Sequence, residues 1–323
     1  MHRRTFLFLP FLSALTLFAN PSQPWHLGKY GNFTFENVHQ NIYIMHGVIS
    51  APDDDNIGFI TNPAFIETKH GLILIDPGAS YEIGLHVLKQ IRSISQKPII
   101  AIFNTHDHDD HWFANAVFKE AYPDATIYAH TKMEAAAIEL YGGDYVKRGF
   151  SFDKAQHICF ADVGLEGGET LMIDGETFHI QHPQNAHTNN DISISHLDSN
   201  TIFMGDLLMS KALANFGLHS SILGNISFLE KIEREKPYDL YVAGHGPSGS
   251  REEAFIPYLT YLRIIKEEVQ IAYDQEVSRN DFSEIEEKIL LHLSWEENLS
   301  FSHAFVNRYM HHIYSELETT DNF

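Results

Sequence analysis

The stretch that decides most about this chain is the hexapeptide His106-Asp107-His108-Asp109-Asp110-His111. Within it, His106, His108 and Asp110 alternate along the backbone, whereas His111 follows Asp110 directly and must point elsewhere. The segment therefore offers imidazoles to one metal ion, and a carboxylate with an imidazole to a second ion close by. Imidazole and carboxylate ligands without a thiolate favour zinc, with iron or manganese as the alternatives. In a chain with 21 histidines, a polar loop without a metal is the competing interpretation.

Three further candidate ligands lie downstream, each beside an apolar run. His187 precedes the strand-like residues 192–195, Asp206 follows the apolar residues 201–204 through a glycine, and His245 stands between two glycines after a strand-like run. One such residue alone is more often a hydrogen-bonding loop residue than a ligand. Their shared position next to predicted strands makes the set a strong indication of a metal site.

With these elements, the chain resembles the metallo-β-lactamase-fold hydrolase superfamily over roughly residues 35–250. An upstream segment, residues 71–78, adds a strand that ends in Asp76 and Gly78. Within the superfamily, the chain is most similar to periplasmic members associated with sulfur oxidation and with quinoprotein dehydrogenase clusters. Three short strings carry that closer resemblance: Asn56-Ile57-Gly58-Phe59-Ile60, Ile102-Phe103-Asn104-Thr105-His106 and Tyr314-Ser315-Glu316-Leu317-Glu318.

The resemblance implies two zinc ions per chain, with a hydroxide between them as the nucleophile. The implied ligands fall into two sets joined by a bridging Asp206: His106, His108 and His187 for the first ion, and Asp110, His111 and His245 for the second. Asp110 would also orient the hydroxide, which makes it the candidate catalytic residue. Asp76 is expected either to hydrogen-bond to a ligand or to cap the turn after its strand, and not to bind metal.

The implied substrate is a small molecule with a carbonyl group. Asp206 separates this chain from the β-lactamase subclass that carries a cysteine there, and Met209 stands where that subclass has a lysine for the substrate carboxylate. We therefore expect hydrolysis of a thioester, lactone or ester in preference to a β-lactam. Phe59, Trp112 and Phe113 are either walls of the substrate pocket or ordinary core aromatics.

Two other classes of function stay open. One is an iron-dependent sulfur dioxygenase on the same fold, in which a single iron uses a subset of the same ligands. The other is a non-catalytic periplasmic binding or maturation partner of a sulfur-oxidation or quinoprotein system, which would have a protein partner.

The net charge and the N-terminal sequence limit where the protein is expected and which partners it can have. The formal net charge of −21 argues against a nucleic-acid-binding surface, which needs clustered Lys and Arg. Residues 1–20 combine Arg3-Arg4 with a short apolar run, as in an export signal of the twin-arginine or the Sec type. The chain is therefore expected in the periplasm, with membrane contact only through an uncleaved signal. The single cysteine, Cys159, is expected to be buried and inert.

The order of expected elements indicates an α/β protein, an αββα four-layer sandwich with a helical appendage. Strands are predicted at 41–50, 57–67, 72–75, 99–103 and 125–129, and helices at 81–93, 114–121 and 132–141. Strand and helix alternate in two blocks, each with ligands at strand ends, as two sheets with helices outside require. The predicted boundaries are 25–250 for the sandwich and 251–323 for the helical C-terminal extension.

Overall fold

The computed structural model describes residues 33–52, 56, 58–148, 158–217, 219–292 and 299–320. The expected export signal at residues 1–20 lies outside these ranges. None of the helices in the described part of the chain is long and apolar enough to cross a membrane.

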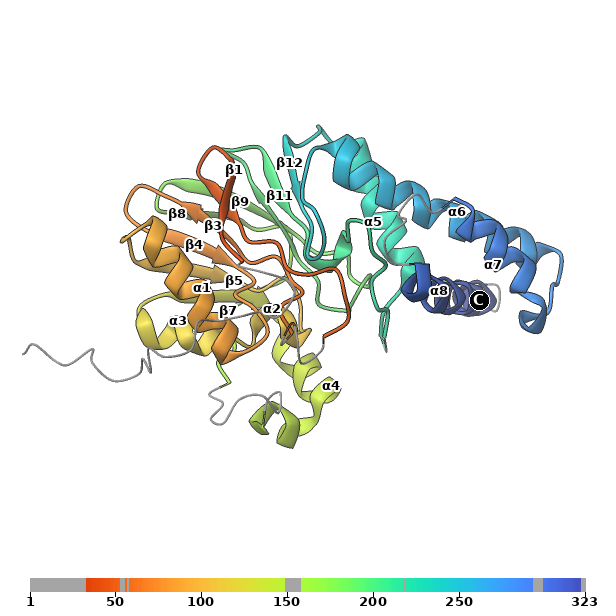
Figure 1. Ribbon diagram of the computed structural model, residues 1–323, viewed down its shortest axis with the longest axis horizontal. Coiled ribbons are helices and arrows are strands. Elements are labelled where there is room, and N and C mark those ends of the chain that lie inside the picture. The colour runs from red at the N-terminus through yellow and green to blue at the C-terminus, as the bar shows by residue number, and fades with distance from the viewer. Residues whose placement is uncertain are drawn as a thin grey trace, which may run out of the picture.

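Two β-sheets form the centre of the molecule (Figure 1). The first sheet has seven strands in chain order: β1 (Glu36–His39), β2 (Ile42–Ile44), β3 (Ala64–Glu67), β4 (Leu72–Ile75), β5 (Ile99–Phe103), β6 (Thr126–His130) and β7 (Val163–Leu165). The pairs from β1 to β4 are antiparallel, and those from β4 to β7 are parallel. The second sheet has the order β12 (Leu240–Val242), β11 (Thr201–Phe203), β10 (Ser193–His196), β9 (Glu176–Gln181) and β8 (Thr170–Ile173).

Helices cover the outer face of each sheet (Figure 1). On the first sheet lie α1 (Tyr81–Ile94) and α3 (Asn115–Ala121); on the second lie α5 (Ile222–Arg234) and the start of α6 (Ile256–Asp274). Helix α8 (Leu299–Thr320) packs against α5 and α6. The remaining helices are α2 (Asp109–Trp112), α4 (Met133–Arg148) and α7 (Ser283–Leu290). Alternation along β4 shows why the layers form: Leu72 and Leu74 pack under α1, while Ile73 and Ile75 face the second sheet. The predicted αββα sandwich is confirmed.

The C-terminal helices share their buried core with the second sheet. Phe255, directly before α6, and Leu259 of α6 belong to one apolar cluster with Tyr309 and Ile313 of α8 and Tyr241 of β12. The helical extension expected from the apolar spacing is therefore present, and it packs on the sandwich through α5 and α6.

The predicted strands at 41–50 and 57–67 are shorter than expected. Only residues 42–44 and 64–67 belong to the sheet, although Met45 N still donates to Pro63 O at 2.9 Å and Val48 N to Phe59 O at 3.1 Å. The reason is tertiary, because this segment leaves the sheet to line a cavity with Ser50, Ile60 and their neighbours.

Candidate metal centre

Four strand ends deliver the candidate ligands to one end of the sandwich. The hexapeptide follows β5, and its second half forms α2, whereas the sequence suggested only a loop there. Asp206 lies in the short 3₁₀ turn after β11, and His245 follows β12. His187 lies in the loop between β9 and β10. The structure thus gathers all seven predicted side chains into one cluster.

The first group consists of four side chains whose donor atoms all lie within 4.8 Å of one another: His106, His108, His187 and Asp206. His187 Nε2 lies 3.0 Å from His108 Nδ1 and 3.4 Å from Asp206 Oδ2. His106 Nε2 lies 3.9 Å from the same carboxylate oxygen. Three imidazole nitrogens and one carboxylate oxygen thus face a common point.

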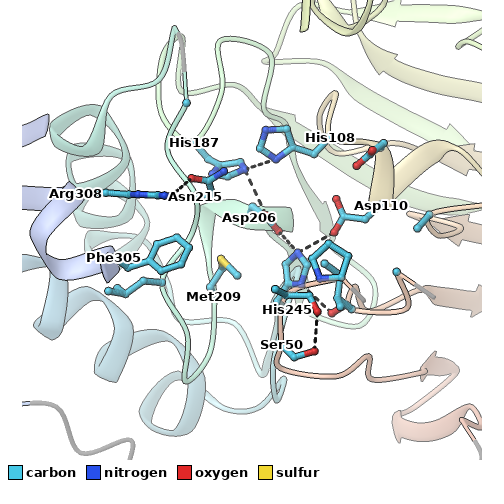
Figure 2. Close-up of a pocket in the computed structure, with 18 of the residues that line it drawn as sticks. Ser50, His108, Asp110, His187, Asp206, Met209, Asn215, His245, Phe305 and Arg308 are labelled. Carbon is cyan, nitrogen blue, oxygen red and sulfur yellow. Dashed lines mark hydrogen bonds and ion pairs between the residues drawn. The ribbon is translucent and has the colours of Figure 1, made fainter. Parts of the chain in front are cut away.

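The second group lies on the other side of Asp206. His111 Nε2 and His245 Nε2 are 3.2 and 3.3 Å from Asp206 Oδ1. Asp110 Oδ2 lies 3.3 Å from His245 Nε2 and 3.7 Å from His111 Nε2. The two oxygens of Asp206 therefore face two separate sets of ligands, and Figure 2 shows this carboxylate between His187 and His245.

Several of these atoms are buried without a hydrogen-bond partner. They include His106 Nε2, His111 Nε2 and Asp206 Oδ1, all of which face the cluster. Burying a polar atom without a partner costs about 1–3 kcal/mol, so such atoms point to a missing ligand. A pair of divalent cations fits the donor set, because imidazole and carboxylate are ligands that zinc, iron and manganese accept.

Hydrogen bonds fix which nitrogen of His106, His111 and His245 faces the cluster. His111 Nδ1 donates to Asp76 Oδ2 at 2.8 Å, and His245 Nδ1 donates to Ile60 O at 2.8 Å. Asp76 also accepts from Thr105 Oγ1 at 2.7 Å, and this hydroxyl in turn lies 3.0 Å from His106 Nδ1. Each of these histidines keeps Nε2 for a metal. Asp76 thus has the supporting role that the sequence predicted.

Two histidines of the first group and two of the second have pKa values shifted in opposite directions. Burial and the neighbouring imidazoles hold the pKa of His106 well below its usual value, and burial lowers that of His187 to about 3. Burial also opposes the charged form of His245, but Asp206 and Asp110 raise its pKa to about 10. Asp110 and Asp206 raise the pKa of His111 in the same way. A cation that binds His106 and His187 therefore displaces no proton from them, whereas a cation that binds His111 and His245 displaces protons.

Gly205 and Gly244 allow the strand ends that carry the candidate ligands to lie close together. A Cβ at Gly205 would lie 2.5 Å from Thr105 Oγ1, and its φ of +50° is in the left-handed region. A Cβ at Gly244 would lie 2.2 Å from Asp206 Oδ1. The glycines that precede Asp206 and His245 in the sequence are therefore needed for the two strand ends to meet.

Asp191 holds the loop that carries His187. Its carboxylate accepts from Thr188 N at 2.7 Å and from Thr188 Oγ1 at 2.9 Å. Nearby, Asn190 Nδ2 donates to Asp107 Oδ1 at 3.0 Å, which ties this loop to the hexapeptide. These bonds place His187 opposite His106 and His108.

A cavity of about 620 Å³ opens over the two groups (Figure 2). His108, Asp110, His187, Asp206 and His245 line its floor. Its walls come from five distant segments and are mostly apolar: Ala51, Pro52, Ile60, Ala79, Leu140, Met209, Leu213, Ala304 and Phe305. The candidate ligands are thus accessible to a small molecule.

The structure places three aromatic candidates in the core and adds lining residues that sequence reasoning missed. Phe59, Trp112 and Phe113 are buried in apolar clusters and do not line this cavity. Asn215, Phe305 and Arg308 line it instead. The helical spacing of Val306 and Tyr309 predicts their helix, but no local motif marks Arg308, because its place depends on how that helix docks.

The family model described as the metallo-beta-lactamase superfamily matches residues 56–245, which is more than half of the chain. The chain belongs to this superfamily. The matched region contains all seven candidate ligands and ends before α6, so the C-terminal helices lie outside it.

Curated relatives agree with this assignment. The chain is 27% identical to a probable metallo-hydrolase of Methanocaldococcus jannaschii over 60% of this chain and 91% of that protein. It is 25% identical to a probable metallo-hydrolase of Streptococcus pyogenes over 58% of this chain and 79% of that protein. A linear primary-alkylsulfatase of a Pseudomonas species is 50% identical over 46 residues, which is 14% of this chain and 9% of that protein.

Solved structures share the superfamily fold. A metallo-beta-lactamase from Pontibacter korlensis aligns with a TM-score of 0.57 and 18% identity, over 72% of this chain and 99% of that chain. The sec-alkylsulfatase Pisa1 from a Pseudomonas species aligns with a TM-score of 0.63 and 13% identity, over 88% of this chain and 50% of that chain.

Other titratable clusters lie away from the metal centre. His130 and His182 stack with ring centroids 3.9 Å apart, and His196 hydrogen-bonds to Glu176 and Ser199. Cys159 is half-buried rather than fully buried, and burial raises the pKa of its thiol, as for an unreactive cysteine.

Proposed function

We propose that this chain is a dinuclear zinc hydrolase that cleaves a carboxylic ester, thioester or lactone. The observation that carries the proposal is Asp206, whose two oxygens face two complete and separate sets of ligands at 3.2–3.9 Å. One carboxylate that serves two cations keeps them close together, as in two-metal hydrolytic sites.

The bound cations, Asp110 and the apolar walls would each have a separate role in the reaction. Bound cations would lower the pKa of a coordinated water and polarise the carbonyl. Asp110 lies on the cavity floor beside His245, so its carboxylate can accept a proton of the attacking water and orient it. The apolar walls exclude bulk water and leave room for the acyl chain.

Met209 argues against a β-lactam as the preferred substrate. It lies on the cavity wall, where it offers no charge to a substrate carboxylate. A hydrogen bond to a charged group is worth about 1.5–3 kcal/mol, or about ten- to a hundredfold in rate. We therefore expect a lower kcat/KM for β-lactams than for esters, thioesters and lactones.

The alkylsulfatase relatives favour a second candidate, the hydrolysis of a sulfate ester. The structural likeness to Pisa1 spans 88% of this chain, which exceeds the share spanned by the metallo-beta-lactamases. In this alternative, the sulfate group takes the place of the carbonyl group over the metal cluster.

Metal content and a substrate panel test both candidates. Protein purified without chelator should contain close to two equivalents of metal, mainly zinc, by elemental analysis. The kcat/KM of a thioester, a lactone, an alkyl sulfate and a chromogenic cephalosporin should then be compared at one pH and ionic strength. A cephalosporin preferred by more than about tenfold, which is about 1.4 kcal/mol, contradicts the argument from Met209.

The same measurements separate the other two classes of function. One iron per chain and no zinc, with oxygen uptake on a persulfide, would instead identify the sulfur dioxygenase. Full metal content without turnover of any substrate would favour the binding or maturation partner.

We further propose export to the periplasm and membership of a sulfur-oxidation or quinoprotein system. Residues 1–20 and the three short strings quoted above support this proposal. Fractionation of cells that express the full chain should place the protein in the periplasmic fraction, and replacing Arg3 and Arg4 by Lys should retain it in the cytoplasm if the route is twin-arginine export.

A further inference from the structure

Arg308 and Asn215 form a second polar end of the cavity, on the side away from Asp110 and His245 (Figure 2). Neither residue is a candidate metal ligand. Resting on the proposed hydrolysis of an ester, we propose that Arg308 of α8 binds an anionic group of the substrate, remote from the bond that is cleaved. The preferred substrates would then be esters whose apolar chain ends in a carboxylate or a similar anion.

The arrangement of the cavity supports a substrate that has a polar group at each end and an apolar chain between them. Its floor carries the metal cluster, and Ile60, Met209 and Leu213 are among the apolar residues of its walls. Arg308 reaches the cavity from the side of α8, next to Asn215 (Figure 2). A cavity of about 620 Å³ is within the usual range for a small-molecule site, so it has room for a chain between the two polar ends.

Arg308 has the permanent positive charge that an anion needs. Lys and other Arg side chains are absent from the described lining of the cavity. No carboxylate in the described part of the chain pairs with Arg308: Nη1 donates to Asn215 Oδ1 at 3.5 Å, and Cζ lies 5.6 Å from the Phe305 ring centroid. Neither contact neutralises the guanidinium. In a chain with a net charge of −21, such a cation in the lining of the cavity is available to a ligand.

Contacts of α8 hold Arg308 in place relative to the metal cluster. The hydroxyl of Tyr309, the next residue, donates to Ala214 O at 2.9 Å. The Tyr309 ring lies 5.3 Å from that of Phe216, which in turn lies 5.5 Å from the imidazole of His187. The helix that carries Arg308 is thus packed against the loop that borders a candidate ligand, although it lies outside the region matched by the family model.

A matched pair of esters tests the proposal. Mono-p-nitrophenyl adipate and p-nitrophenyl hexanoate have acyl chains of equal carbon number, and only the adipate ends in a carboxylate. With the zinc-loaded wild type, kcat/KM should be about ten- to a hundredfold higher for the adipate, as expected for a hydrogen bond to a charged group. This preference should weaken with added salt, because Arg308 is exposed.

Variants at Arg308 assign the preference to this residue. Arg308→Met should bring the ratio of the two kcat/KM values close to one, and Arg308→Lys should keep part of the preference, because an ammonium group supplies charge without the planar fork. The control is Arg234→Met, which removes the same charge at an exposed position at the end of α5. It should keep the wild-type ratio.

A binding measurement separates this proposal from the proposed hydrolysis. The dissociation constant of 1-octanesulfonate, measured by calorimetry on the metal-loaded protein, should rise at least about tenfold in Arg308→Met and stay unchanged in Arg234→Met. If neither ester is hydrolysed but this difference is found, the ester hydrolase fails and the anion site stands. Equal turnover of both esters by the wild type, or unchanged octanesulfonate binding in Arg308→Met, overturns the anion site.

Discussion

At the scale of single residues, Asp206 lies between the two groups of candidate ligands. Replacing it by Asn keeps the volume of the side chain but removes the charge that would neutralise two neighbouring cations. Changes around a metal site commonly cost about 10–100-fold in metal affinity, so loss of this shared ligand should weaken the second metal by at least about 100-fold. Elemental analysis after dialysis should find close to one equivalent in Asp206→Asn.

The matched control for this prediction is Asp124→Asn, which removes the same charge from an exposed turn before β6. It should retain both metals. Retention of two equivalents and full turnover by Asp206→Asn would show that this carboxylate does not bridge.

A second prediction at this scale concerns the pH dependence of folding through His130. Burial and the facing His182 and Lys132 lower the pKa of His130 to about 4, against the attraction of Glu166 and Glu169. Between about pH 6.5 and pH 4 the unfolded chain therefore binds a proton that the folded chain rejects, so the free energy of unfolding falls as the pH is lowered through this window. Allowing for screening by solvent, we expect a loss on the order of 1 kcal/mol.

His130→Asn offers the test, because an amide oxygen can still accept from Lys132 N, as His130 Nδ1 does at 3.1 Å. The slope of unfolding free energy against pH should be smaller for this variant than for the wild type at equal metal content. Identical slopes would mean that His130 titrates normally in the folded protein.

At the scale of helices and strands, one carboxylate fastens the C-terminal helix to the sandwich. Glu316 of α8 accepts from Ile222 N at 2.8 Å and from the hydroxyl of Ser221, at the first turn of α5. Ser221 Oγ in turn accepts from Gly224 N at 2.8 Å. A carboxylate at a helix N-terminus satisfies free N–H groups and interacts favourably with the helix dipole.

Glu316→Ala should therefore lower the free energy of unfolding by about 1–2 kcal/mol. Hydrogen exchange should accelerate in α8 and in the first turn of α5. Urea unfolding gives the free energy, and Glu287→Ala, at an exposed position of α7, is the control with the same loss of charge. An equal effect of both substitutions would show that Glu316 does not anchor α8.

The segment between β2 and β3 is an example of tertiary contacts that override a local strand pattern. Its apolar residues predict two long strands, yet the pairing in the sheet stops at Ile44 and resumes at Ala64. Ile60 instead faces the cavity, and its carbonyl orients His245. The apolar pattern of a segment indicates that its side chains are buried. It does not show whether the segment is a strand or a buried loop that lines a cavity.

For the molecule as a whole, the sandwich and the identity of the candidate ligands could be predicted from the sequence alone. Alternating and continuous apolar runs place strands and helices, because burial of an apolar face requires those periods. The hexapeptide, the Gly-Asp and the Gly-His-Gly elements mark the ligands, because chemistry limits metal ligands to a few side chains and glycine is required where strand ends approach closely.

Which side chains surround the cavity over the candidate ligands could not be predicted, because it depends on how distant segments pack together. The tertiary structure placed Phe59 and Trp112 in the core and brought Phe305 and Arg308 to the cavity, 60 and 63 residues beyond the last candidate ligand, His245. The physical reason is that a wall residue need not have any particular local sequence. Its position follows from how α8 docks through Tyr309 and Glu316, and such contacts between distant segments leave no periodic pattern in the chain.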